Sequence, residues 1–122
     1  MTIVPNFLLK KMYRSGSLKS TEEGFSFEMI NCLGPGQLTR INSVTLNDLT
    51  FKTEQITFKH DDVLLPAIQI TDDNPASFLL NQITTVLVES SPLPSGDYTL
   101  KLDVVSREAG QVTLTVKDKL PA

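Results

Sequence analysis

Strict alternation of apolar and polar residues near the C-terminus is the feature that most restricts the fold of this chain. Between Tyr98 and Val104 every second residue is apolar, and the same pattern returns between Val112 and Val116. Side chains of a β-strand point alternately to its two faces, so this alternation predicts strands with one buried face. The turn between the two segments contains Gly110, a residue suited to a positive φ, and we therefore predict a β-hairpin.

The rest of the chain contains further strand candidates. Residues 24–30 alternate in the same way, with Phe25, Phe27 and Met29 on one face. Other segments are rich in Thr, Val, Ile and Phe and are separated by turn-forming residues, at 38–46, 51–59, 65–70 and 83–89. Together these patterns predict an all-β fold, an antiparallel β-sandwich of about seven or eight short strands. At most one short helical turn is expected, over residues 75–80.

The composition fits one folded cytoplasmic domain. The 122 residues are 40% hydrophobic and 20% charged, so we expect residues 1–122 to form a single domain with its own core. The formal net charge of −3 offers no basic face to nucleic acid, which is not expected as a partner. No stretch approaches the roughly 20 apolar residues of a membrane span, and the N-terminus does not resemble a secretory leader. The single cysteine requires no oxidising compartment.

Few residues offer catalytic or metal-binding chemistry. The chain has one His and one Cys, too few for a structural zinc site, so no metal or cofactor is expected in this chain. Cys32 and His60 could form a nucleophile and base pair. However, Cys32 follows a predicted strand, where a small residue is commonly packed, and His60 lies in a charged turn. We expect no catalytic residue.

Two loop motifs are better explained by turn formation than by ligand binding. Asp72, Asp73 and Asn74 could offer oxygen ligands to calcium, but the spacing of an EF-hand loop is absent. Asn and Asp side chains accept local backbone hydrogen bonds, which explains this cluster. The motif at residues 34–36, Gly-Pro-Gly, lacks the Lys and the longer glycine spacing of a phosphate loop.

One segment departs from clean alternation. If residues 6–14 form a strand, Phe7 and Leu9 face one way while Leu8 and Met12 face the other. A sandwich strand needs only one apolar face, so the second must meet a covering loop, a second copy of the chain or another subunit. An edge strand tucked under its own N-terminal arm is the alternative. Shorter apolar runs raise the same question at residues 63–65, 78–80 and 86–88.

Several stretches resemble the small β subunits of bacterial C-glycoside deglycosidases. The most distinctive are PNFLLKKMY at residues 5–13 and LGPG at 33–36, and PSGDYTL at 94–100 is similar too. Further matching positions are GSL at 16–18, Gly24, Phe25, Phe27, Asn31, Gly110 and VKD at 116–118. The likeness spans most of the chain and is strongest over the first third, while residues 48–91 carry little that matches.

The resemblance implies an accessory β subunit of a carbon–carbon lyase, inactive alone. In that family a TIM-barrel α subunit holds a divalent metal, usually manganese, together with the acid–base residues. The complex cleaves the bond between a 3-oxo sugar and a flavonoid aglycone. A ketone at C3 acidifies the proton at C2, and a metal can stabilise the resulting enediolate. The implied partners are therefore this α subunit and a 3-oxo C-glycoside substrate.

We expect the contact with an α subunit at the N-terminal arm or strand, residues 1–15, with the Gly-Pro-Gly turn beside it. The residues predicted at this interface are Asn6, Phe7, Leu8, Leu9, Met12, Tyr13, Leu33, Gly34, Pro35 and Gly36. One alternative is a free-standing β-sandwich module that binds carbohydrate or protein, although the chain has no Trp and only two Tyr. A second alternative is an independent hydrolase or isomerase that uses Cys32 and His60.

Overall fold

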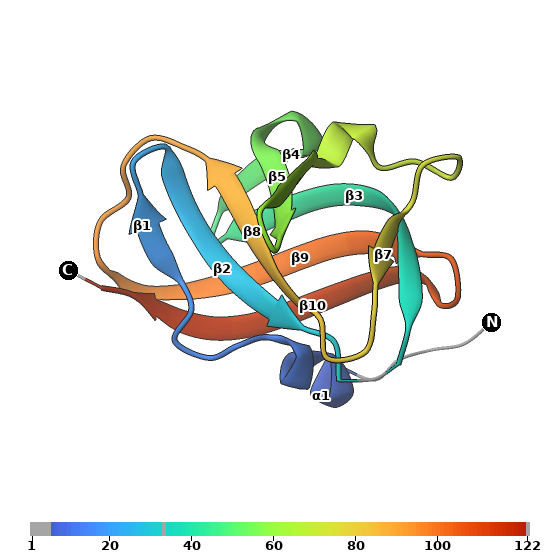
Figure 1. The fold of residues 1–122 in the computed structure, drawn as a ribbon. Coiled ribbons are helices and arrows are strands. Elements are labelled where there is room, and N and C mark those ends of the chain that lie inside the picture. Colours follow the sequence, from blue (N-terminus) through green and yellow to red (C-terminus); the bar gives the residue numbers. More distant parts are fainter. Residues whose placement is uncertain (1–5, 33, 122) are drawn as a thin grey trace.

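The computed structural model describes residues 6–32 and 34–121, with the backbone alone for residues 6 and 7. Two antiparallel sheets pack face to face (Figure 1). The first sheet has the order β1 (Lys19–Thr21), β2 (Gly24–Ile30), β8 (Ile83–Glu89), β5 (Ile56–His60) and β6 (Val63–Pro66). The second has the order β10 (Gly110–Leu120), β9 (Gly96–Ser106), β3 (Gly36–Leu46) and β4 (Leu49–Lys52), and β7 (Ala76–Phe78) pairs with the start of β3. The predicted all-β antiparallel sandwich is confirmed, with ten strands in the described residues where about seven or eight were expected.

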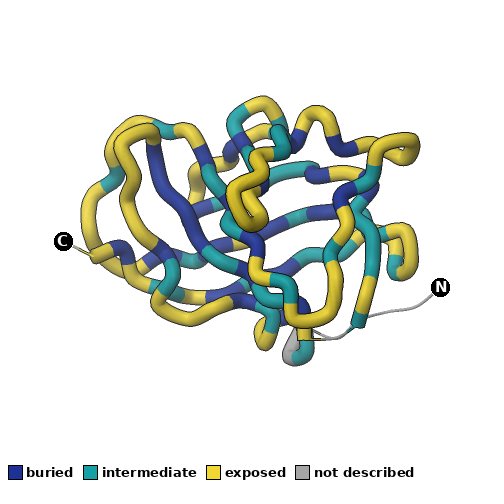
Figure 2. The backbone as a smooth tube through the Cα atoms, viewed as in Figure 1, coloured by how far each residue is buried: buried dark blue, intermediate teal, exposed yellow. Residues whose placement is uncertain are grey.

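The hydrophobic core lies between the two sheets. Figure 2 shows buried residues as dark blue stretches along the strands of both sheets. In the β9–β10 hairpin, inward-pointing Leu102 pairs with inward-pointing Leu114, as the alternation predicts. Phe25 of β2 meets Phe51 of β4 across the interior, with ring centroids 5.2 Å apart. Each fully buried side chain of this size stabilises the fold by roughly 1.5–3 kcal/mol.

Two predicted strands are interrupted by 3₁₀ turns. The segment 51–59 is divided at η2 (Thr53–Gln55), so that β4 lies in the second sheet and β5 in the first. A single strand could not do this, because the chain has to cross from one layer to the other. The predicted strand 65–70 ends at Pro66, and η3 (Ala67–Gln69) follows. Proline has no N–H to donate to a sheet, which favours a strand end at this position.

A strand also replaces the expected helical turn at residues 75–80. Ala76–Phe78 forms β7, whose residues pair with the first residues of β3: Phe78 with Gly36, and Ala76 with Leu38. The helical prediction here is wrong, since pairing with a distant strand decides the local backbone conformation.

The N-terminal segment is helical where a strand was expected. Asn6–Leu9 form α1, a single turn, and Lys10–Met12 extend it as the 3₁₀ turn η1. Residues four apart share one face of a helix, so Leu9 and Tyr13 both point into the core while the two lysines between them are exposed. The prediction of a strand with two apolar faces is wrong because it used a period of two. No helix of the described residues has the length and apolar character to cross a membrane.

The outer faces of the two sheets differ in character. On the second sheet, outward positions of β9 carry polar residues such as Lys101 and Asp103. On the first sheet the outward positions include Leu87, Leu64 and Ile83. Leu64 is 58% exposed and Ile83 is 40% exposed. The outer face of the first sheet is therefore the more apolar one.

Candidate functional site

A cavity of about 640 Å³ opens between the sheets, and residues of β7 and of the β9–β10 turn contribute to its lining. Figure 1 shows that these two elements lie at the same end of the sandwich. Its inner wall is apolar and comes from both sheets. The deepest contributors include Met29, Phe58 and Val86 from the first sheet and Leu102, Val104 and Leu114 from the second. Small-molecule sites commonly have volumes of about 300–1,000 Å³ and a mainly apolar lining. The cavity has the size and the character of such a site.

The bent first half of β3 forms one wall of this cavity. The pairing of β3 with β9 shifts register between Leu38 and Arg40 and again between Ile41 and Ser43. Extra residues of this kind bend a strand and increase its twist. The first half of β3 thus pairs with β7 as well as β9, and Leu38 lines the cavity.

A buried asparagine holds two loops together at the rim. Asn31, only 2% exposed, follows β2, and its Nδ2 donates hydrogen bonds to the carbonyls of Gly34 (2.6 Å) and Phe78 (2.7 Å). The backbone N–H of Asn81 donates to the Asn31 carbonyl at 2.7 Å. These bonds join the β2–β3 connection to the β7–β8 loop. Because the amide is buried and bonded, this part of the rim has a defined geometry.

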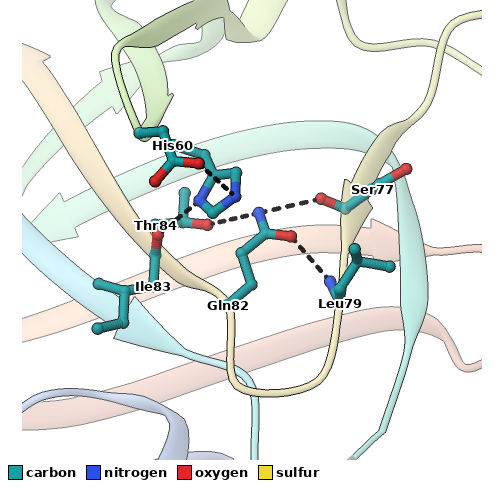
Figure 3. A network of polar contacts seen from close by, with 7 residues as sticks. His60, Ser77, Leu79, Gln82, Ile83 and Thr84 are labelled. Carbon is teal, nitrogen blue, oxygen red and sulfur yellow. Dashed lines mark hydrogen bonds and ion pairs between the residues drawn. The ribbon is translucent and has the colours of Figure 1, made fainter.

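The side chain of Gln82 joins the two ends of the β7–β8 loop through hydrogen bonds (Figure 3). Its Oε1 accepts the N–H of Leu79 at 2.9 Å, and its Nε2 donates to the Ser77 carbonyl (3.2 Å) and to Thr84 Oγ1 (3.1 Å). Asn81 takes a positive φ of 66° within this turn, a conformation that Asn tolerates better than most residues. The loop is therefore held by side-chain bonds to its own backbone.

His60 stands at the same rim, at the end of β5. Its Nδ1 lies 3.0 Å from the carbonyl of Ile83, as Figure 3 shows. A carbonyl only accepts, so Nδ1 carries the proton in this contact, and Nε2 lies 3.6 Å from Asp61 Oδ2. The imidazole thus links β5 to β8.

The β9–β10 turn forms the opposite rim. Glu108 Oε1 accepts the backbone N–H of Gln37 at 3.0 Å, and this bond is the main reason why the pKa of the Glu108 carboxyl lies below its usual value. Arg107 donates to Gln37 Oε1 (2.8 Å) and to the Asp72 carbonyl (2.7 Å). The turn is tied both to β3 and to the loop before β7, and it presents an ionised carboxylate at the mouth.

The structure brings together some of the residues predicted from the sequence to form an interface. Leu9, Met12, Gly34, Pro35 and Gly36 all line the cavity. Their contact with another chain stays a prediction. The interface residues that do not line the cavity are Leu8, which is half-buried in α1, and Tyr13, which is buried in the core. Leu33, residues 1–5 and the side chains of Asn6 and Phe7 lie outside the described part of the chain.

Sequence reasoning missed most of the cavity. Met29, Phe58 and Val86 have the pattern of ordinary core residues, and Asn31 and Gln82 have that of turn residues. A positional signal existed for Met29, Asn31 and Gln82, which lie at or beside strand ends, whereas Phe58 and Val86 lie in the middle of β5 and β8. Recognising it requires the strand order, which the sequence does not show.

The structure also shows the surroundings of the residues considered for other chemistry. Within residues 6–32 and 34–121, no group of three His, Cys, Asp or Glu side chains could hold a metal ion. Cys32 is an exposed free thiol. In the loop proposed for calcium, Asn74 Nδ2 donates to the Gln69 carbonyl at 2.8 Å and its backbone N–H donates to Thr71. Those bonds agree with turn formation.

A family model for the N-terminal domain of hydroxymethylglutaryl-CoA reductase matches residues 8–121. No curated protein matches the chain. The match covers nearly the whole chain and overturns the resemblance to β subunits of C-glycoside deglycosidases. That resemblance rested on short strings, several of which lie at turns and strand starts, where unrelated sandwiches need the same residues. The chain belongs to the family of the hydroxymethylglutaryl-CoA reductase N-terminal domain.

Proposed function

We propose that this chain is a non-catalytic binding module that holds an apolar ligand in the cavity between its sheets. The observation that carries the proposal is an apolar cavity of about 640 Å³ with a hydrogen-bonded rim. Burying apolar surface stabilises a complex by roughly 25 cal/mol for each Å² removed from water. A ligand that fills such a cavity gains most of its binding free energy in this way.

The rim argues against a simple packing defect. Protein interiors are close-packed, and a void whose walls can relax tends to shrink. Here the side chains of Asn31 and Gln82 brace the β7–β8 loop, and Glu108 and Arg107 brace the β9–β10 turn. These bonds oppose collapse of the opening, which supports a preformed site.

The family match supports a module that works beside a catalytic chain or domain, because the family is named for one domain of a larger enzyme. An accessory role is therefore the second candidate function. The exposed apolar residues Leu64 and Ile83 on the outer face of the first sheet favour it, since they offer a surface for a partner. Cleavage of a 3-oxo C-glycoside with manganese in a TIM-barrel partner stays a prediction. The resemblance on which it was based is overturned by the family match.

Titration with the uncharged dye Nile red tests ligand binding. We expect saturable binding of one dye molecule per chain, with the blue-shifted emission of an apolar environment. Val112→Phe adds bulk to a half-buried residue of the cavity lining and should weaken binding at least tenfold. Val105→Phe is the matched control, because Val105 is also half-buried but does not line the cavity. Absent binding, or equal loss in both variants, contradicts the proposal.

The accessory role has its own test. The chain is co-expressed with a catalytic chain encoded beside it, and the mixture is analysed by size-exclusion chromatography. Leu64→Glu should abolish co-elution, while Lys101→Glu on the polar outer face of the second sheet should not. Co-elution that survives Leu64→Glu would exclude this face as the contact.

A further inference from the structure

We infer that the cavity selects an uncharged apolar molecule and discriminates against one of the same shape that carries a carboxylate or a phosphate. The inference rests on the proposed function and adds the charge of the ligand. Among the described residues, the charged side chains that line the cavity are Asp61 and Glu108. No Lys or Arg of the described residues lines it.

The two carboxylates come from opposite sheets. Asp61 lies in the β5–β6 turn of the first sheet, and Glu108 lies in the β9–β10 turn of the second. Glu108 is held in place by the Gln37 N–H and by Ser106 Oγ at 3.3 Å, which favours its ionised form. Asp61 is exposed beside His60 Nε2, at 3.6 Å. A ligand that enters the cavity therefore passes between negative groups.

The cations nearest to the cavity lining in sequence do not line it themselves. Arg107 neighbours Glu108, but its guanidinium donates to Gln37 Oε1 and to the Asp72 carbonyl. Lys10 and Lys11 precede Met12, which lines the cavity, yet both lysines are exposed and neither lines it. The basic side chain that does line it is His60, whose Nδ1 bonds to the Ile83 carbonyl and whose Nε2 lies 3.6 Å from Asp61 Oδ2, so both ring nitrogens already contact oxygen atoms of the protein.

Desolvation adds to this discrimination. An anion that moves from water into an apolar cavity loses hydration, at an effective cost of several kcal/mol unless a cation or hydrogen-bond donors replace the water. The side-chain amide donors of Asn31 and Gln82 are already used, since Asn31 Nδ2 and Gln82 Nε2 bond to backbone carbonyls. An uncharged molecule incurs no such cost, so the apolar lining stabilises it fully.

Displacement of Nile red by 1-decanol and by decanoate tests the inference, because the two molecules share a ten-carbon chain. At pH 7.5 and low ionic strength we expect 1-decanol to displace the dye and decanoate to bind at least tenfold more weakly. Part of this difference is intrinsic to the two molecules. The diagnostic variant is therefore Asp61→Asn with Glu108→Gln, which removes both charges with nearly unchanged shape.

In this double variant, decanoate affinity should rise about fivefold at low ionic strength, while 1-decanol affinity stays the same. Asn tolerates the positive φ of 52° at position 61, and the new amide at position 108 keeps an oxygen for the Gln37 N–H. Asp97→Asn, at the other end of β9, is the control and should change neither affinity. If the double variant unfolds, the wild type is titrated at increasing salt concentration instead. Salt screens the two carboxylates, so it should strengthen binding of decanoate and leave binding of 1-decanol unchanged.

Three results would overturn the inference. The first is decanoate binding as tight as that of 1-decanol, and the second is a decanoate affinity that neither charge removal nor salt improves. The third is decanoate binding that Arg107→Gln abolishes, which would reveal an anion site. Failure of both Nile red and 1-decanol to bind would instead contradict the proposed function itself.

Discussion

The Tyr13 hydroxyl donates a hydrogen bond to Asp118 Oδ2 at 2.5 Å, and this bond joins residues 105 positions apart. It connects the end of the first helical turns to the last strand, β10, which is the outermost strand of the second sheet. The same carboxylate oxygen accepts the backbone N–H of Gly16 at 3.0 Å and that of Leu18 at 3.4 Å. The segment that leads into β1 is thereby anchored on the edge of the opposite sheet.

Removal of the Tyr13 hydroxyl should destabilise the whole sandwich. A hydrogen bond to a charged group contributes about 1.5–3 kcal/mol, so Tyr13→Phe should lower the free energy of unfolding by about that amount. Tyr98→Phe is the control, because the Tyr98 hydroxyl donates to the neutral carbonyl of Pro94 at 2.7 Å. Tyr98→Phe should lower the free energy of unfolding by about 0.5–1.5 kcal/mol, as measured by urea denaturation. Equal losses in the two variants would show that the charge of Asp118 contributes nothing.

Asp118 should also shape the acid stability of the protein. Burial disfavours ionisation of its carboxyl, but hydrogen bonds from Tyr13, Lys119, Gly16 and Leu18 outweigh burial and hold its pKa below the usual value. The folded state therefore prefers the carboxylate. The resulting stability is complete above the unfolded pKa near 3.8 and is lost as the pH falls through the lower folded pKa.

Asp118→Asn should accordingly flatten the decline of the unfolding free energy below about pH 4, as measured by urea denaturation from pH 7 to pH 2. Tyr13→Phe should flatten it less, because it removes one of several donors to the carboxylate. An unchanged acid slope in Asp118→Asn would assign the acid sensitivity to other carboxyls.

The rim asparagine gives a prediction about the cavity loops. Asn31→Asp places carboxylate oxygens where Nδ2 now lies 2.6 Å and 2.7 Å from two carbonyls. Repulsion and the loss of two buried hydrogen bonds should destabilise the fold by about 3 kcal/mol or more at neutral pH. Asn42→Ala, which removes a single bond to the Asp103 carboxylate, should cost less than Asn31→Asp, about 1.5 kcal/mol, because this bond is long at 3.2 Å. Thermal melting compares the two variants. An Asn31→Asp melting temperature equal to that of the wild type would mean that the two Asn31 hydrogen bonds are dispensable for stability.

Much of the sandwich could be predicted because its alternation is visible locally. The strands β2 and β8 and the β9–β10 hairpin lie where the pattern places them, since each buries one face. The break at Thr53–Gln55 and the strand at Ala76–Phe78 could not be predicted. Both depend on which distant strand is the partner, and sequence spacing says nothing about that.

The N-terminal segment was mispredicted because the two-residue period of a strand was applied to a helical segment. Its apolar residues were assigned to the two faces of a strand, whereas a helical turn puts Leu9 and Tyr13 on one inward face. The cavity itself was not predicted. Gly34 and Pro35, which line it, were expected at an interface, while Met29 and Phe58 have the pattern of core residues and line it because both sheets contribute to its wall. The family could not be inferred from short strings that turns and strand starts share.

Gly24 should prove indispensable for the first sheet. A Cβ at this position would lie 2.0 Å from the Val88 carbonyl oxygen and 2.6 Å from the Ser90 nitrogen, both backbone atoms of β8 or the residue after it. These backbone atoms cannot move away without breaking the β2–β8 pairing. Gly24→Ala should therefore lower the free energy of unfolding by more than about 3 kcal/mol. Gly36→Ala is the matched control, because its Cβ would meet only the end of the Glu108 side chain, at 3.0 Å, and no backbone atom within 4 Å. Circular dichroism during urea denaturation compares the two, and a Gly24→Ala chain as stable as Gly36→Ala would contradict the close approach of β2 and β8.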